Sequence, residues 1–129
     1  MNTTKAGKNI DMKTLVIGAS EKPERYANQA VRLLLEYGHE VEAIGARQGL
    51  IETVPIRTGN PVLESIDTVT LYVGPQRQGN LMEYVTGLKP RRVIFNPGTE
   101  NPDFAKQLLA SGIEPIEACT LVMLRTAQW

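Results

Sequence analysis

The chain has 129 residues, of which 42% are hydrophobic and 22% charged, and its 14 basic residues balance 14 acidic ones. This length and composition are typical of one globular domain with its own core. A formal net charge of zero argues against nucleic acid as a partner. No apolar run approaches the roughly 20 residues of a membrane span, so we expect no membrane partner. The single cysteine, Cys119, excludes an internal disulfide and fits the cytoplasm, where we expect the protein to reside.

The first residues are polar and lack the pattern of a secretory signal peptide. We expect residues 1–12 to form a disordered leader and residues 13–129 to form the folded domain.

Strand and helix patterns alternate along the rest of the chain. Strands are predicted at residues 14–17, 39–44, 67–73, 93–95 and 113–116, with a short extended piece at 51–56 inside a loop. Helices are predicted at residues 30–37, 78–88, 102–111 and 119–127. This alternation predicts an α/β fold: one doubly wound, Rossmann-like parallel sheet in a three-layer α/β/α domain with right-handed crossovers.

Four predicted strands end in glycine-bearing turns at their carboxyl ends. These turns are Gly18-Ala19-Ser20, Gly45-Ala46-Arg47, Gly74-Pro75 and Asn96-Pro97-Gly98. Turns need glycine in any protein, but ligands of doubly wound sheets bind beyond this same edge. A rim of small residues there leaves room for a flat or extended ligand.

The first of these turns has the features of an anion site. An apolar run reaches Gly18, and a helix follows Ser20; glycine allows close approach of the backbone, and free N–H groups at a helix start favour an anion. The dinucleotide fingerprint Gly-x-Gly-x-x-Gly is absent, which makes NAD a poor first candidate.

The end of the second predicted strand separates the nucleotide candidates. An NAD site needs an acidic residue there for the ribose diol, and the chain has Gly45, Ala46 and Arg47 instead. Arg47 is either a solvated charge or a partner for a ribose phosphate, as in NADP or in coenzyme A with its 3′-phosphate.

The segment Val16–Ser20, followed by Pro23, Arg25 and Tyr26, resembles the small bacterial CoA-binding domain proteins. These are similar to the nucleotide-binding domain of the succinyl-CoA synthetase alpha subunit, and the resemblance runs from Lys13 to Leu124. It implies a Rossmann-like CoA-binding fold and no particular reaction.

The resemblance also implies which residues bind the ligand. The phosphate loop falls on Gly18, Ala19 and Ser20, with Arg25 and Tyr26 just beyond it. The second-strand tip, commonly Val-Asn-Pro and a basic residue in the family, falls on residues 44–47, where only the basic residue is kept. The remaining positions are Asn96-Pro97-Gly98 and Cys119.

We therefore expect a protein that binds coenzyme A or an acyl-CoA without evident catalytic machinery of its own. The alternatives are an NADP-linked oxidoreductase, an acyl-CoA ligase-type subunit, or an interaction protein that keeps the fold but not the ligand. Both a homodimer and a partner subunit of an enzyme remain open as assemblies.

Four further features of the sequence lead to expectations that the structure can address. Cys119, at the start of a predicted helix, is either a small packed hydrophobe or a thiol that forms a mixed disulfide with CoA. His39 lies at the strand end opposite the ligand edge and is expected to be a surface turn residue. Arg91 and Arg92 are expected to be a solvated pair, and Trp129 to pack in a groove or a dimer contact. With one His and one Cys, the sequence shows no metal-ligand cluster.

Overall fold

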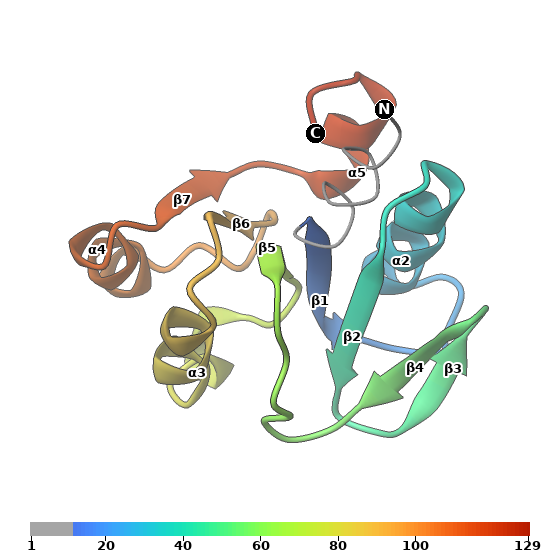
Figure 1. Cartoon of the computed structure of the whole chain (residues 1–129), viewed down its shortest axis with the longest axis horizontal. Helices are drawn as coiled ribbons and strands as arrows, with labels where there is room; N and C mark the ends of the chain where they lie inside the picture. The colour runs from blue at the N-terminus through green and yellow to red at the C-terminus, as the bar shows by residue number, and fades with distance from the viewer. Residues whose placement is uncertain (1–11) are drawn as a thin grey trace, which may run out of the picture.

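The computed structural model describes residues 12–129, so the predicted leader lies, apart from Met12, outside the described residues. The described chain forms a seven-stranded sheet in the order β3-β4-β2-β1-β5-β6-β7 (Figure 1). The strands are β1 (Lys13–Ala19), β2 (Val41–Gly45), β3 (Gly49–Ile51), β4 (Val54–Arg57), β5 (Ile66–Leu71), β6 (Arg92–Phe95) and β7 (Glu114–Glu117). The helices are α2 (Tyr26–Glu36), the 3₁₀ turn η1 (Pro75–Arg77), α3 (Leu81–Leu88), α4 (Pro102–Ala110) and α5 (Thr120–Arg125).

The central strand, β1, pairs in parallel with β2 on one side and with β5 on the other. Its continuous apolar run is buried on both faces: Leu15 and Ile17 belong to one core and Val16 to the other. This is why the run lacks the alternation of a half-exposed strand. All strand pairs are parallel except β3 with β4, which is antiparallel.

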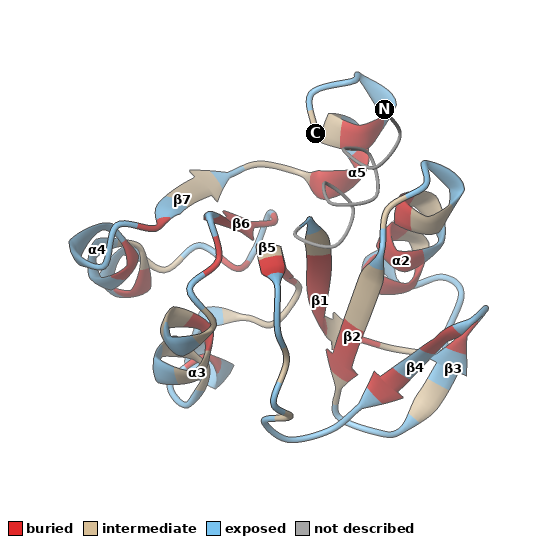
Figure 2. Ribbon diagram, in the orientation of Figure 1, coloured by how far each residue is buried: buried red, intermediate tan, exposed pale blue. Residues whose placement is uncertain are grey.

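Two hydrophobic cores cover the two faces of the sheet (Figure 2). On one face, Val85 of α3 and Phe104 and Leu108 of α4 pack against the sheet. On the other face, α2 packs with Leu124 of α5 against β1, β2 and the β3–β4 hairpin. The three-layer, doubly wound fold predicted from the sequence is therefore confirmed.

The chain leaves β1 toward β2 and β4, and later returns to the other side of β1 as β5. The strand order therefore reverses between β1 and β5. The carboxyl ends of these two strands mark the topological switch point, where ligands of this architecture bind.

Two local predictions differ from the structure. The loop with a short extended piece at residues 51–56 is a hairpin of β3 and β4, turning at Glu52 with a positive φ of 52°. Strands of three and four residues are too short to show a period-2 pattern. The helix predicted at residues 78–88 begins only at Leu81, after the η1 turn and Gly79.

Candidate functional site

The carboxyl ends of β2, β1 and β5 meet with little separation between their backbones. Gly45 lies opposite Ala19 in the β1–β2 register, and a Cβ on Gly45 would overlap the carbonyl oxygen of Ala19. Gly18 has a φ of +100°, and a Cβ there would lie 3.0 Å from the carbonyl carbon of Tyr72. Two of the predicted glycines are thus required by the way the strand ends pack.

The start of α2 offers free backbone donors beside these strand ends. The first helical bond runs from the Gln29 N–H to the Arg25 carbonyl at 3.1 Å, so the N–H groups of Tyr26, Ala27 and Asn28 have no intrahelical partner. No side chain caps this terminus, and no acidic residue lies in its first turn. The helix starts at Tyr26, six residues after Ser20, so the turn between strand and helix is shorter than the predicted helix at residues 30–37 implied.

Side chains from inside α2 hold this turn in shape. The buried Asn28 donates from Nδ2 to the Ser20 carbonyl at 2.8 Å and accepts from Arg32 Nε at 2.7 Å. Arg32 also donates to the Pro23 carbonyl at 3.2 Å. Sequence reasoning missed this pair; the only signal was a polar Asn28 beside the apolar stripe of the helix.

The charged residues predicted for the site lie at its surface. Arg25, Tyr26 and Arg47 are all exposed, Tyr26 at 69%. Ser20 is partly exposed, and its Oγ accepts from the Lys22 N–H at 3.1 Å, which leaves the hydroxyl hydrogen available. The Glu21 carboxylate accepts from the Leu50 N–H at 2.8 Å and so ties the turn to β3.

The loops that follow β5 and β6 are fixed to each other by one buried glutamine. Gln78 donates from Nε2 to the carbonyls of Val73 and Thr99, both at 2.8 Å, and its Oε1 accepts from Asn101. This arrangement holds the predicted Gly74-Pro75 turn, where Pro75 opens η1.

Asn96 is buried and its side chain is fully used inside the protein. It donates to Thr70 Oγ1 at 2.7 Å and to the Leu71 carbonyl at 2.8 Å, and accepts from the Thr120 N–H at 2.8 Å. Its side chain therefore joins β5, β6 and α5, while the neighbouring Pro97 and Gly98 are exposed at the rim.

Cys119 and Tyr72 lie together at the switch point. Cys119 is half-buried and precedes α5, and its charge would act on the Tyr72 phenol. The Tyr72 hydroxyl is buried with no hydrogen-bond partner; the hydroxyls of Thr120 and Thr70 lie near it but outside hydrogen-bonding geometry. Burial raises the pKa of Tyr72 to about 12.

The structure brings the predicted turns of β1 and β2 together directly. The turn after β6 joins them through Asn96, which bonds β5, and through Thr120 beside Cys119. The resulting rim is an open surface. A hollow of about 300 Å³ lies elsewhere, at the amino edge of the sheet beside Lys13, His39 and Val41. We place the candidate site at the rim because the free backbone donors and the switch point are there.

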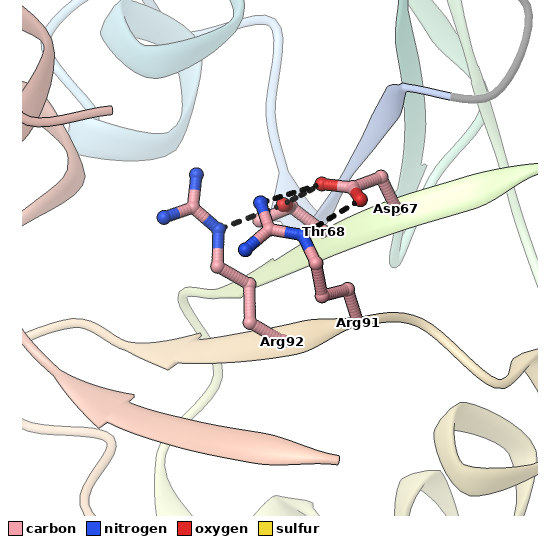
Figure 3. Close-up of polar contacts among 4 residues, drawn as sticks. All are labelled: Asp67, Thr68, Arg91 and Arg92. Carbon is pink, nitrogen blue, oxygen red and sulfur yellow. Dashed lines mark hydrogen bonds and ion pairs between the residues drawn. The ribbon is translucent and has the colours of Figure 1, made fainter.

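The amino edge carries a further correction to the sequence interpretation. Arg92 is not solvated: it is 6% exposed, and its guanidinium carbon lies 4.6 Å from the centroid of the Trp129 ring. Arg91 is exposed but forms an ion pair with Asp67 (Figure 3). His39 meets Trp129 edge-on at 6.1 Å, and burial together with the Arg92 charge lowers the pKa of His39. Arg91 and Arg92 were wrongly predicted as a solvated pair because adjacent side chains at a strand point in different directions. Here one is exposed and the other is buried.

A family model of the CoA binding domain matches residues 12–125. The chain belongs to the CoA-binding domain family. The resemblance stated from residues 16–26 and the strand tips is thus confirmed over almost the whole described chain.

Several solved structures share the fold of this CoA-binding domain protein. An uncharacterised protein is 45% identical, with a TM-score of 0.88 over 91% of this chain and 97% of that one. A hypothetical protein from Pyrococcus horikoshii OT3 shares the fold at 21% identity, with a TM-score of 0.80 over 96% and 87%. Acetyl-coenzyme A synthetase 1 from Ca. Korarchaeum cryptofilum shares it at 17% identity and a TM-score of 0.70, over 92% of this chain and 28% of the synthetase. No curated protein matches the chain.

Within residues 12–129 no three His, Cys, Asp or Glu side chains gather as metal ligands. None of the helices in the same range combines the length and apolar character needed to cross a membrane.

Proposed function

We propose that this CoA-binding domain protein binds coenzyme A or an acyl-CoA along the carboxyl edge of its sheet, without catalytic machinery of its own. The observation that carries the proposal is the uncapped start of α2 beside the Gly18-Ala19-Ser20 turn. Three free N–H groups and the positive end of the helix favour the pyrophosphate of a nucleotide. Family membership supplies the identity of that nucleotide.

Arg47 supports coenzyme A over NAD. It follows the end of β2, in the position where an NAD site has an acid, and its side chain is exposed. A guanidinium there suits the 3′-phosphate of CoA, and Arg25 adds a second positive charge at the start of α2. The exposed ring of Tyr26 offers an apolar face beside them.

The other two turns complete the proposed site. Gly74, Pro75, Pro97 and Gly98 form the rim on the far side of the switch point, where their small size leaves the backbone open to an extended pantetheine arm. In this proposal Asn96 acts by positioning, since its side chain is fully bonded within the protein. Cys119 lies at the same edge and is half-buried.

A second candidate is the role of a subunit in an acyl-CoA ligase. It is favoured by the fold match to an acetyl-coenzyme A synthetase in which this chain corresponds to 28% of the neighbour's length. In that case the domain would bind CoA as proposed, and the activating chemistry would lie on another chain.

Calorimetric titration with CoA, dephospho-CoA, NADP and NAD tests the proposal. We expect CoA to bind most tightly and dephospho-CoA to bind more weakly, because it lacks the 3′-phosphate that faces Arg47. Binding of NAD with no heat from CoA would contradict the proposal, and silence from all four would favour a protein that keeps the fold but not the ligand.

Two variants test the residues. R47A should weaken CoA binding about tenfold to a hundredfold, because one charge-assisted contact of roughly 1.5–3 kcal/mol is lost. The same variant should leave the binding of dephospho-CoA unchanged. S20D combined with R47A should abolish CoA binding, since a carboxylate then faces the phosphates. R125A, an exposed arginine at the far end of α5, is the control and should bind CoA as the wild type does.

A further inference from the structure

Arg92 is a covered arginine at the edge of the sheet opposite the proposed CoA site. It is the first residue of β6, so it lies at the amino edge, and it is 6% exposed. Arginine is rarely covered to this extent unless its charge is paired. The question is what pairs with it.

Neutral or aromatic groups fix the side chain of Arg92. Its Nε donates to Thr68 Oγ1 at 2.9 Å, and the Thr68 hydroxyl in turn donates to Asp67 Oδ2 at 2.7 Å. The ring of Trp129 covers one face of the guanidinium at 4.6 Å. One edge and one face of the planar group are therefore occupied, and its orientation is set.

The two terminal nitrogens of Arg92 have no acceptor among residues 12–129. Asp67, a carboxylate that acts on the charge of Arg92, is held by Arg91 through two bonds of 3.0 and 3.1 Å and by Thr68. Figure 3 shows the two guanidinium groups side by side, with the terminal nitrogens of Arg92 pointing away from Asp67. Glu114 lies opposite Arg92 in the β6–β7 register, but it forms no ion pair with it.

These nitrogens keep a small contact with solution. Among the described residues, the one fully buried side-chain nitrogen or oxygen without a partner is the Tyr72 hydroxyl, so the terminal nitrogens of Arg92 share in the 6% of the residue that stays exposed. Burial and the charge of Arg91 lower the pKa of Arg92. A negative partner would offset both effects.

We propose that Arg92 is a binding site for a small oxyanion, a carboxylate or a phosphate, distinct from the CoA site. The two terminal nitrogens present a planar, bidentate edge that matches two acceptor oxygens. Trp129 lies against the face of the group, and no residue in the range 12–129 accepts a hydrogen bond from this edge. Phosphate and carboxylate share the required chemistry, and the arms of the test separate them.

Trp129 is the single tryptophan of the chain and touches Arg92, so its fluorescence reports on the site. The full-length protein is titrated with sodium phosphate and, separately, with sodium acetate, against sodium chloride at the same ionic strength. We expect a saturable change in fluorescence with phosphate, acetate or both, and none with chloride. The anion that saturates identifies the class. Equal, non-saturating changes with all three salts would overturn the proposal.

R92Q should lower the affinity for the responding anion at least tenfold, because the charge and the fork are lost. R57Q is the control: Arg57 is exposed at the carboxyl end of β4, away from the amino edge, so binding should persist. An unchanged response in R92Q would contradict the site.

A measurement on the unmodified protein keeps the proposal testable if R92Q fails to fold. ¹⁵N-detected signals of the arginine side chains should show one guanidinium shifting with the fluorescence titration. If no arginine signal moves while the fluorescence saturates, the anion binds elsewhere and the proposal fails.

Discussion

Two glycines shape the proposed CoA site by having no side chain. Gly45 lies against the Ala19 carbonyl and the Ile56 side chain, and Gly18 lies against the Tyr72 backbone. The close contact of Gly45 lets β1 and β2 continue in register to the rim. Gly45 therefore has two effects: it lets the strands pack closely, and it keeps the surface free of a side chain where a ligand would lie.

We predict that Gly45→Ala destabilises the fold by about 1–3 kcal/mol, the usual cost of forcing a methyl group into a packed site. The β1 and β2 ends must move apart, so CoA binding should fall as well. Urea denaturation measures the first effect and calorimetry the second.

Gly87→Ala is the matched control. Gly87 lies in α3, nothing lies within 4 Å of where its Cβ would be, and its φ is not positive, so alanine there should raise the free energy of unfolding by about 0.5–1 kcal/mol. If Gly45→Ala is as stable as Gly87→Ala, the contact with Ala19 is not tight in solution.

Among single residues, the sequence predicted the glycines of the turns but not the side chains that hold those turns in place. Gly18 and Gly45 were found because they follow apolar runs. Asn28, Tyr72 and Arg92 were missed or misassigned because their roles depend on partners elsewhere in the chain: Arg92 bonds Thr68, 24 residues away. Local patterns carry no information about such contacts.

Residues at the start of helix α4 determine where the helix begins. Asn101 accepts from the Phe104 N–H at 3.2 Å as the N-cap, and Pro102 occupies the first turn. Phe104 meets Phe95 of β6 edge-to-face at 5.4 Å, and Leu108 is fully buried one turn later. The helix therefore joins the sheet through one face only.

Two adjacent leucines of α4 test whether the helix packs on the sheet through one face only. Leu108 is 0% exposed and Leu109 is 64% exposed. Leu108→Ala should lower the free energy of unfolding by about 2–5 kcal/mol, because a cavity remains in the core. Leu109→Ala should change it by less than about 0.5 kcal/mol. Midpoints of urea unfolding for the two variants decide the matter; similar losses in both would contradict the orientation of the helix.

The elements were predictable to different degrees. The central strand β1 was predicted because burial on both faces gives a continuous apolar run, and β2 because its residues alternate. Helix α4 was predicted because a proline near its start and a glycine after its end are local signals. The β3–β4 hairpin was only partly predicted, since it is stabilised by contacts such as the Glu21–Leu50 bond that link distant segments. Helix α2 begins at Tyr26, four residues before the predicted range of 30–37, because the prediction rested on the apolar stripe, which starts only at Ala30.

Over the whole molecule, the two edges of the sheet differ in construction. The carboxyl edge is a rim of turns with free backbone donors. At the amino edge Trp129 contacts both His39 and Arg92, and Arg91 pairs with Asp67 nearby. A group that titrates at the amino edge should therefore change the stability of the fold without belonging to the proposed CoA site.

His39 is that group. Its pKa in the folded protein lies below its ordinary value of 6.5, because burial and the nearby Arg92 charge disfavour the protonated ring. Between these two pKa values the unfolded chain binds a proton that the folded chain does not, so lowering the pH favours unfolding. The contribution is fully present above pH 6.5 and is lost as the pH falls through the folded pKa.

We therefore predict that the free energy of unfolding falls between about pH 7.5 and about pH 5.5, where histidine is the side chain that titrates. The chain has a single histidine, so His39→Gln should flatten the slope in this range. The pKa of Asp67 is also lowered: burial raises it, but the hydrogen bonds from Arg91 and Thr68 and the nearby arginine charges outweigh burial. That contribution is lost only below its ordinary value of 3.8, which separates it from the His39 window. An equal slope in wild type and His39→Gln would show that the contact of His39 with Trp129 and Arg92 does not control its protonation.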